Sequence, residues 1–109
     1  MQQYIERNYQ DLDHTLKSIS REYRTRVGDA DFLAEDKNGK IVIEVKIGTA
    51  SDSAVGQLLG YLNALRTENN KVRGILVAEG FTERVKMAVK SDRVTLMKYK
   101  AKLDISVEK

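Results

Sequence analysis

The chain has 109 residues, of which 41% are apolar and 32% charged, with a formal net charge of +3, and this predicts one small domain with its own core. It contains no cysteine, which excludes a disulfide framework, a thiolate metal site and a cysteine nucleophile, and leaves hard, oxygen-ligated cations as the metals to consider. The chain has no membrane-length apolar run and no signal-like N-terminus, so we expect a cytoplasmic protein with no membrane contact.

The first element is predicted from an apolar stripe near the N-terminus. The stripe consists of Ile5, Tyr9, Leu12, Leu16 and Ile19. This spacing predicts an amphipathic helix over roughly residues 2 to 19. One side of the helix should pack on a sheet.

A weakly alternating segment, residues 21–27, predicts the first strand, and Gly28 marks a break after it. Arg21, Arg24 and Arg26 would alternate along this strand at the edge of the sheet. There they either contact phosphates or keep an exposed edge soluble, and position alone does not separate these two roles.

A hairpin follows, with strands predicted at residues 29–36 and 40–47. It carries Asp31 on one strand, and Glu44 and Lys46 on the other. Hard divalent cations prefer carboxylate oxygens, and a nearby ammonium group can stabilise charge on a phosphate or on an attacking water. The pattern therefore indicates metal-dependent hydrolysis of a phosphodiester.

Two registers of this hairpin are compatible with the sequence. A turn at Asn38-Gly39 places Asp31 opposite Lys46, and brings Asp31, Glu44 and Lys46 onto one face. The other face then collects the apolar residues Phe32, Ala34, Ile41, Ile43, Val45 and Ile47.

The alternative is a turn over Lys37-Asn38 with Gly39 as a bulge, which places Asp31 opposite Val45 and separates the two carboxylates. We favour the first register, because it separates apolar from ionisable side chains. Burial of Glu44 without partners would also cost several kcal/mol.

The remaining elements alternate between helix and strand. They are a loop at residues 48–53 whose Ser51, Asp52 or Ser53 caps the next helix, a buried helix to about Leu65, a strand at 72–78, a helix from Thr82 to about Lys90 and a strand at 94–99. The order α-β-β-β-α-β-α-β predicts an α/β fold with a mixed sheet, in which a helix crossover leads to the fourth strand.

Basic residues gather between residues 83 and 102. They are Arg84, Lys86, Lys90, Arg93, Lys98, Lys100 and Lys102, against Glu83 and Asp92. This segment either meets a polyanion such as nucleic acid or forms an ordinary solvated face.

Three motifs occur in the order Gly28-x-x-Asp31, Glu44-Val45-Lys46 and Gln57-x-x-x-Tyr61. Together they resemble the PD-(D/E)XK nuclease superfamily, specifically its RecB-like branch. Residues 21–25, 54–58 and 72–78 make the chain more similar still to the C-terminal nuclease domain of the NucS/EndoMS mismatch endonucleases of archaea and actinobacteria.

The resemblance implies one nuclease domain over residues 1–109, with a restriction-endonuclease-like three-layer core and a mixed sheet of about four to five strands flanked by helices. The separate N-terminal DNA-binding and dimerisation domain of that family has no counterpart in these 109 residues. Mismatch specificity is therefore not carried over.

The same resemblance implies roles for the hairpin residues. Asp31 and Glu44 would bind Mg²⁺ or Mn²⁺, and the backbone carbonyl of Val45 would complete the protein ligands. Lys46 would orient or activate the attacking water.

Three further residues receive roles in the same way. Gln57 and Tyr61 would support the substrate, and four-residue spacing lets both project from one face of a helix. They could equally be a polar edge and a core ring of a buried helix. Glu6 lies where the family carries an acid on its first helix, which suggests a metal-associated acid.

The expected function is a Mg²⁺-dependent endodeoxyribonuclease with a role in DNA repair. A Holliday-junction or flap resolvase of the same fold and a non-catalytic nucleic-acid-binding module are the alternatives. So small a domain leaves little surface for reading DNA, so we expect a homodimer. A larger repair or helicase complex is a further possible partner.

Overall fold

A computed structural model of the chain describes residues 2–12, 14–66, 72–89 and 93–100. Its centre is a five-stranded sheet with the order β1-β2-β3-β5-β7. The strands are β1 (Ser18–Thr25), β2 (Gly28–Asp36), β3 (Gly39–Val45), β5 (Val72–Ala78) and β7 (Val94–Lys98). The first three strands are antiparallel, and β5 and β7 run parallel to β3, so the predicted mixed sheet is confirmed.

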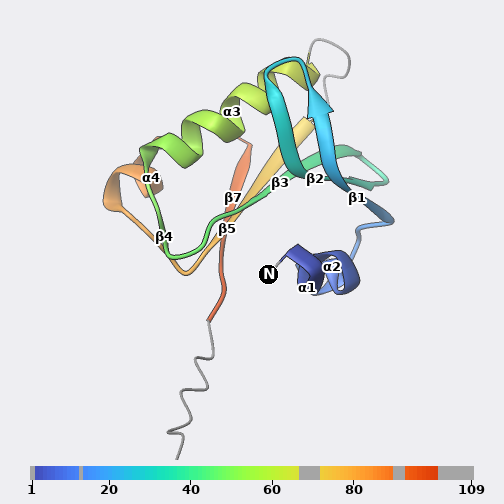
Figure 1. Cartoon of the computed structure of the whole chain (residues 1–109), viewed down its shortest axis with the longest axis horizontal. Helices are drawn as coiled ribbons and strands as arrows, with labels where there is room; N and C mark the ends of the chain where they lie inside the picture. Colours follow the sequence, from blue (N-terminus) through green and yellow to red (C-terminus); the bar gives the residue numbers. More distant parts are fainter. Residues whose placement is uncertain (1, 13, 67–71, 90–92, 101–109) are drawn as a thin grey trace, which may run out of the picture.

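Helices cover both faces of this sheet (Figure 1). The helices are α1 (Gln2–Arg7), α2 (Tyr9–Leu12), α3 (Asp52–Arg66) and α4 (Glu83–Ala88). Residues of α3 and α4 pack in one apolar cluster with one face of the sheet, and Ile5 of α1 packs in a second cluster on the other face. The expected three-layer α/β architecture is confirmed.

The crossover helix α3 lies directly against the sheet. A Cβ atom at Gly74 of β5 would come within 3.1 Å of Leu58 Cδ1, so the glycine lets α3 approach the central strand closely. The α4 helix begins at the predicted cap, because Thr82 Oγ1 accepts a hydrogen bond from the Val85 backbone N–H at 3.2 Å.

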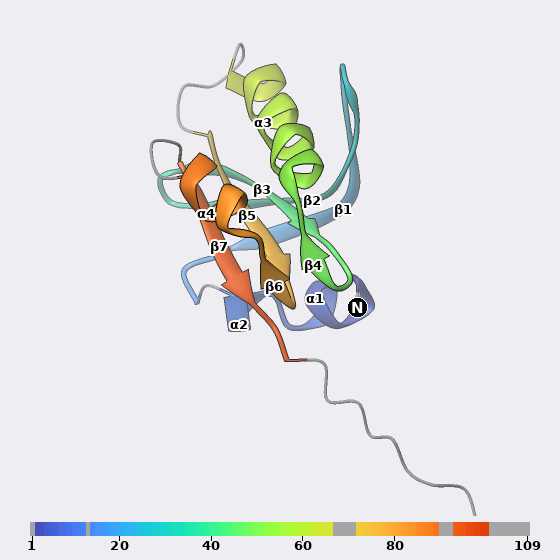
Figure 2. The ribbon, with the colours of Figure 1, turned by 90° about the vertical axis from the view of Figure 1, so that its left-hand side faces the viewer.

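A second, two-stranded parallel sheet pairs β4 (Thr49–Ala50) with β6 (Gly80–Phe81) (Figure 2). Residues 48–53 were expected to be a loop, so this pairing is a correction. Each strand has only two residues, too few for alternation to indicate a strand.

The single helix predicted over residues 2 to 19 is wrong. α1 and α2 end by Leu12, and Ile19 already belongs to β1. All five residues of the predicted stripe nevertheless pack in the cluster on that face of the sheet. A helix and the strand after it can both direct apolar side chains to the same cluster, so the spacing identified the buried residues and not the element.

The β2–β3 hairpin turns at Lys37-Asn38, with Asp36 opposite Gly39 and Leu33 opposite Val42. Neither predicted register is therefore correct. Asp36 Oδ1 accepts hydrogen bonds from the backbone N–H groups of Asn38 at 2.8 Å and Gly39 at 3.0 Å, and this side chain stabilises the observed turn.

The predicted faces are nevertheless correct, except at one end. The observed register differs from the favoured one by two residues, and a two-residue shift keeps each side chain on its face. Phe32, Ala34, Ile41, Ile43 and Val45 share the cluster that contains α1. The exception is Ile47, which is 85% exposed because β3 ends at Val45.

The alternation of β2 is interrupted next to Asp31. Ala30 packs in the α3 cluster although Phe32, two residues later, packs on the opposite face. On the neighbouring strand, Glu22 has a φ of 54°. Pairing is recorded for Arg21 with Phe32 and for Tyr23 with Ala30, but not at the position between them. The sheet is therefore locally distorted at Asp31.

Part of the basic segment, including Lys90, Asp92 and Lys102, lies outside the described residues. Within the part of the chain that the structure describes, no helix is long and apolar enough to cross a membrane.

Candidate metal and catalytic site

Asp31 and Glu44 lie side by side where the β2–β3 ladder ends. The last recorded pair is Phe32 with Ile43, and one step further Asp31 comes level with Glu44. There the side chains replace the ladder: the Asp31 backbone N–H donates to Glu44 Oε1 at 3.0 Å, and the Val45 N–H donates to Asp31 Oδ2 at 2.8 Å. Each carboxylate is thus fixed by the backbone of the opposite strand.

Glu44 is an almost fully buried acid, with 2% of its surface exposed. Burial, followed by the adjacent Asp31 carboxylate, raises the pKa of Glu44 to about 8, against the lowering effects of the Asp31 backbone N–H and of Lys46. Two ionised carboxylates held this closely repel each other, and a cation bound between them would relieve that repulsion. Their oxygen donors suit a hard divalent ion, so the residues fit Mg²⁺ or Mn²⁺.

Lys46 is held over the α3 side of the sheet by a directed chain of hydrogen bonds. Lys46 Nζ donates to Gln57 Oε1 at 3.0 Å, and Gln57 Nε2 donates to Tyr61 Oη at 3.0 Å. An ammonium group only donates, so it fixes which end of the Gln57 amide faces it. Gln57 and Tyr61 therefore project together, as their four-residue spacing predicts.

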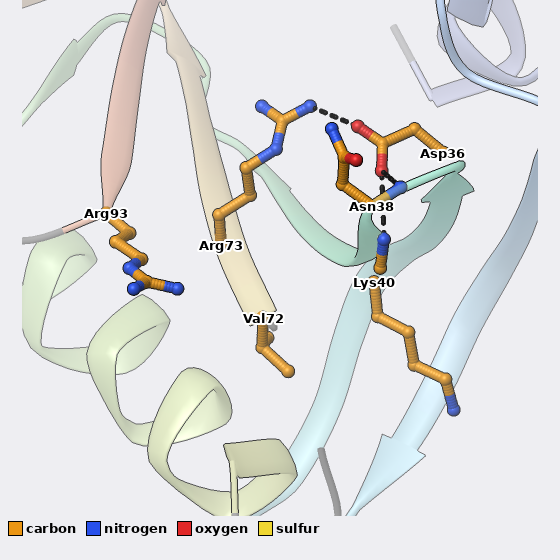
Figure 3. Close-up of a pocket in the computed structure, with 7 residues that line it drawn as sticks. Asp36, Asn38, Lys40, Val72, Arg73 and Arg93 are labelled. Atoms are coloured by element: carbon orange, nitrogen blue, oxygen red, sulfur yellow. Dashed lines mark hydrogen bonds and ion pairs between the residues drawn. The ribbon is translucent and has the colours of Figure 1, made fainter. Parts of the chain in front are cut away.

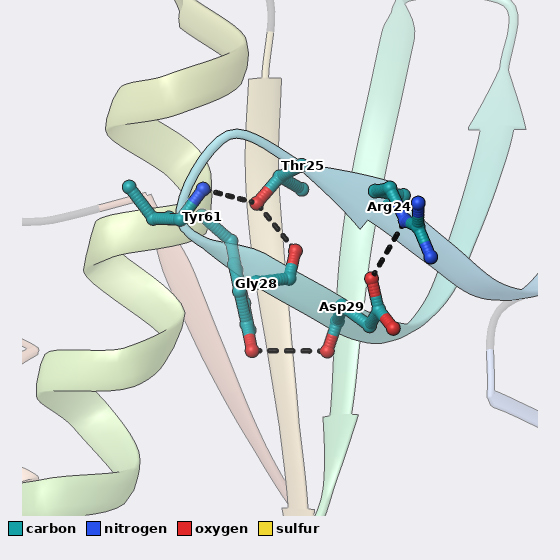
Figure 4. Close-up of polar contacts among 6 residues, drawn as sticks. Arg24, Thr25, Gly28, Asp29 and Tyr61 are labelled. Carbon is teal, nitrogen blue, oxygen red and sulfur yellow. Dashed lines mark hydrogen bonds and ion pairs between the residues drawn. The ribbon is translucent and has the colours of Figure 1, made fainter.

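Tyr61 completes this chain at the start of β2. Its hydroxyl donates to the Asp29 backbone carbonyl at 2.9 Å (Figure 4). The Tyr61 residue is 3% exposed and packs in the α3 cluster, and burial raises the pKa of its hydroxyl, which keeps the donor protonated. A Cβ at Gly28 would lie 3.4 Å from Tyr61 Oη, so this residue of the first motif adjoins the tyrosine. Tyr61 is both a core ring and a polar link.

Glu6 does not join the two carboxylates. It is exposed on α1, the helix layer opposite α3. Among the described residues, no group of three Asp, Glu, His or Cys side chains is arranged to hold a metal ion.

The three arginines of the predicted edge are only partly together. Arg21 and Arg24 belong to β1, which is the edge strand, whereas Arg26 lies in the turn after it. Arg24 Nε is 3.6 Å from Asp29 Oδ1 (Figure 4), and Arg26 Nη2 donates to the Ala64 carbonyl at 3.4 Å. A cavity of about 310 Å³ lies between residues 23–26 and Ala64-Leu65.

Another cavity, of about 290 Å³, lies at the opposite end of β3 from Glu44, beside the hairpin turn (Figure 3). Arg73 Nη2 forms an ion pair with Asp36 Oδ2 at 2.9 Å there, and Arg93 also lines the cavity. The hydrogen bond from Arg73 holds the pKa of Asp36 below its ordinary value. This ion pair ties the turn to β5 and lies away from the two carboxylates.

Three contributions to the site were not predicted from the sequence. The Asp29 carbonyl receives the Tyr61 hydroxyl, and Tyr99 and Glu79 contact the segment after β3. The Tyr99 hydroxyl meets the carbonyl of Lys46, 53 positions away, and Glu79 meets Gly48, 31 positions away. No local pattern signals contacts between residues so far apart in the chain.

The chain is similar to known proteins over most of its length. The family model described as the endonuclease NucS C-terminal domain matches residues 1–106. Endonuclease NucS of Sulfolobus acidocaldarius is 40% identical over 81 residues, covering 73% of this chain and 32% of the relative. A solved structure, a repair endonuclease from Pyrococcus abyssi, superposes with a TM-score of 0.83 at 33% identity, covering 90% of this chain and 44% of that one.

A solved complex of EndoMS with double-stranded DNA also has a TM-score of 0.83, at 32% identity, covering 90% of this chain and 42% of that chain. The chain thus spans only about a third of the length of the curated relatives, from 31% of the Aeropyrum pernix relative to 40% of the Thermococcus kodakarensis relative. The family model is that of a C-terminal domain, and the fold of this chain matches the fold of these solved structures. The chain belongs to the family of the endonuclease NucS C-terminal domain.

Proposed function

We propose that this domain is a Mg²⁺- or Mn²⁺-dependent DNA endonuclease that hydrolyses phosphodiester bonds by a PD-(D/E)XK mechanism. One observation carries the proposal. The carboxyl groups of Asp31 and Glu44 are held together at the end of a strand pair, and Lys46 lies close enough to Glu44 to lower its pKa.

The cation would be held by Asp31, Glu44 and the backbone carbonyl of Val45. Glu6 is left out of this set, because it is exposed on the opposite helix layer. Three protein oxygens leave positions for water and for a phosphate oxygen in an octahedral shell. When bound, the cation supplies charge neutralisation at the phosphate and a lower pKa for a bound water.

The remaining motif residues orient the reacting groups. The Lys46 ammonium donates hydrogen bonds toward the phosphate and the attacking water, where negative charge develops. Gln57 and Tyr61 are positioning residues, since they hold Lys46 through an uninterrupted chain that ends on the Asp29 carbonyl. These hydrogen bonds thus fix the Lys46 amine relative to β2, the strand that carries Asp31.

DNA is the proposed substrate because the relatives are named endonucleases and one related structure is a complex with double-stranded DNA. The description of another as a repair endonuclease supports a role in DNA repair. Arg21 and Arg24 on the edge strand, and Arg26 in the turn, are the proposed contacts to backbone phosphates. Arg24 would exchange its exposed pairing with Asp29 for a phosphate.

A homodimer is proposed for the active form, because specific DNA interfaces bury on the order of 1,000 Å² or more and a second copy would place another cutting centre on the opposite strand. Sedimentation with and without DNA measures this. A fully active monomer at working concentration contradicts the dimer but not the nuclease. A larger repair complex is also proposed, and co-purification would reveal it.

The activity is tested by cleavage of labelled linear, flapped, mismatched and four-way DNA with Mg²⁺, Mn²⁺ or a chelator. Wild type should cleave at least one substrate, and chelation, Glu44→Gln or Lys46→Met should abolish cleavage. Glu35→Gln is the matched control, because Glu35 is an exposed acid on β2. Cleavage by Glu44→Gln at the rate of Glu35→Gln would overturn the proposal.

A further inference from the structure

The segment that follows β3, Lys46 to Gly48, is fixed by contacts from β5 and from the residues that directly follow β5 and β7. Lys46 donates its backbone N–H to the Val77 carbonyl at 2.8 Å, and its own carbonyl accepts from the Tyr99 hydroxyl at 3.2 Å. The peptide groups on both sides of the Lys46 Cα are therefore held. This contrasts with the neighbouring Ile47 side chain, which is 85% exposed.

Glu79 fixes the end of the same segment. Its backbone N–H donates to the Gly48 carbonyl at 2.9 Å, and its Oε1 accepts from the Gly48 N–H at 3.3 Å. The φ of Gly48 is 80°, a conformation that favours glycine. The backbone thus turns sharply just after Lys46, and Glu79 holds both polar groups of the turning residue.

Tyr99 and Glu79 are joined to each other as well. The Tyr99 hydroxyl lies 3.3 Å from Glu79 Oε1, and the Tyr99 backbone N–H donates to the Ala78 carbonyl at 3.0 Å. The Tyr99 ring packs in the cluster on the α1 face, which limits its rotation. The packed ring therefore places its hydroxyl, which has one proton to donate, within hydrogen-bond distance of two acceptors, the Lys46 carbonyl and Glu79 Oε1.

We propose that Tyr99 and Glu79 are positioning residues for Lys46, which hold its backbone while Gln57 holds its ammonium group. This inference rests on the proposed nuclease function. A lysine has four rotatable side-chain bonds, so a contact at its tip alone does not fix where the amine lies relative to the two carboxylates. Fixing the backbone as well removes the remaining freedom, and correct placement of a reacting group is worth large factors in rate.

The test compares Tyr99→Phe with Tyr9→Phe in the cleavage assay. Both variants remove one hydroxyl from a partly buried tyrosine of the same cluster, but Tyr9 lies in α2 and has no assigned role at the site. Tyr99→Phe should lower kcat about tenfold relative to Tyr9→Phe, since one hydrogen bond is lost, with KM changed less than about twofold. Equal kcat in the two variants overturns the inference.

Glu79 provides a second arm with its own control. Glu79→Gln keeps an oxygen that accepts from Gly48 and from Tyr99, whereas Glu79→Ala removes it. We expect Glu79→Gln to retain kcat near wild type and Glu79→Ala to lose about tenfold, again the scale of one hydrogen bond. Equal loss in both variants would assign the effect to charge and contradict positioning.

Amide hydrogen exchange at Gly48 separates this inference from the proposed function. The Gly48 N–H should exchange faster in Glu79→Ala and Tyr99→Phe than in Tyr9→Phe, with similar melting temperatures. If wild type cleaves no DNA but the exchange rate of the Gly48 N–H responds as expected, the nuclease proposal fails. The result that Tyr99 and Glu79 fix the backbone of residues 46–48 then remains valid. If wild type cleaves and Gly48 exchange is unchanged in both variants, the positioning inference alone fails.

Discussion

Asp31 and Glu44 exchange hydrogen bonds with each other's strands: the Asp31 backbone N–H donates to Glu44 Oε1 at 3.0 Å, and Asp31 Oδ2 accepts from the residue after Glu44 at 2.8 Å. This reciprocal arrangement brings two acids together with one of them 2% exposed. It follows from the local loss of regular pairing at Asp31, because the backbone groups freed there bind the carboxylates instead.

Glu44 makes the stability of the metal-free domain depend on pH. Its pKa is raised from the ordinary 4.5 to about 8, so between these values the folded state holds a proton that the unfolded state has released. The free energy of unfolding should therefore fall as pH rises from about 4.5 to about 8. Chemical denaturation at several pH values in a chelator measures this.

Glu44→Gln is the comparison, since its side chain cannot titrate. The pH dependence in this window should be weaker in Glu44→Gln than in wild type, and weaker in wild type when Mn²⁺ is added. The same pH dependence in wild type and Glu44→Gln would show that Glu44 keeps an ordinary pKa in the folded state.

Asp36 gives the free energy of unfolding a pH dependence of the opposite sign, at lower pH, because protonation of Asp36 should destabilise the domain. Its pKa is held below the ordinary 3.8 by Arg73, so its stabilising contribution is complete above that value and is lost as pH falls through the folded-state pKa. The unfolding free energy of wild type should decline on acidification more than that of Asp36→Asn. Parallel acid profiles of the two proteins would contradict the assigned ion pair.

The approach of α3 to the sheet is tested at Gly74. Gly74→Ala would bring a methyl group within 3.1 Å of Leu58 in the core, and overpacking of this kind costs about 1–3 kcal/mol. Gly56→Ala is the matched control: it lies on α3 with nothing within 4 Å, so it should stabilise the helix by up to about 1 kcal/mol. A melting temperature of Gly74→Ala equal to or above that of Gly56→Ala would show that α3 lies further from β5.

Loss of the Gln57 side chain should lower the rate without unfolding the domain. Gln57 is exposed. Among the residues that the structure describes, its amide is the only link between Lys46 Nζ and Tyr61. Gln57→Ala should reduce kcat by about tenfold, the effect of one charge-assisted hydrogen bond on the reacting group. Asn63→Ala removes another exposed amide from α3 and should leave kcat unchanged. Equal kcat values in Gln57→Ala and Asn63→Ala would show that Gln57 does not contribute to the reaction.

Sequence patterns predicted β5, β7 and the α3 and α4 helices well, because caps and apolar runs there are local signals, whereas the two-residue strands β4 and β6 were not predicted. The hairpin register failed for a local reason that competed with the Asn38-Gly39 signal: Asp36 accepts from both of those backbone N–H groups and moves the turn one residue earlier. The side chains still lie on their predicted faces of the hairpin, because moving the turn by one residue changes the pairing between the strands by two residues.

The motif residues of the site could be assembled on paper from alternation in strands and four-residue spacing in a helix. The structure places Asp31 beside Glu44, and links Lys46 to Gln57 and Tyr61. The contributions of Tyr99 and Glu79 could not be predicted, since they arise only when β5 and β7 are placed beside the end of β3.

Asp31 and Glu44 are proposed to share one divalent cation, and direct titration of Mn²⁺ into the metal-free protein tests this most directly. Calorimetry should show a saturable site in wild type and in Glu35→Gln, with binding lost or weakened by at least about tenfold in Asp31→Asn and Glu44→Gln, since each removes a charged ligand. Unchanged Mn²⁺ affinity in Glu44→Gln, with the fold intact, would contradict a cation shared by Asp31 and Glu44.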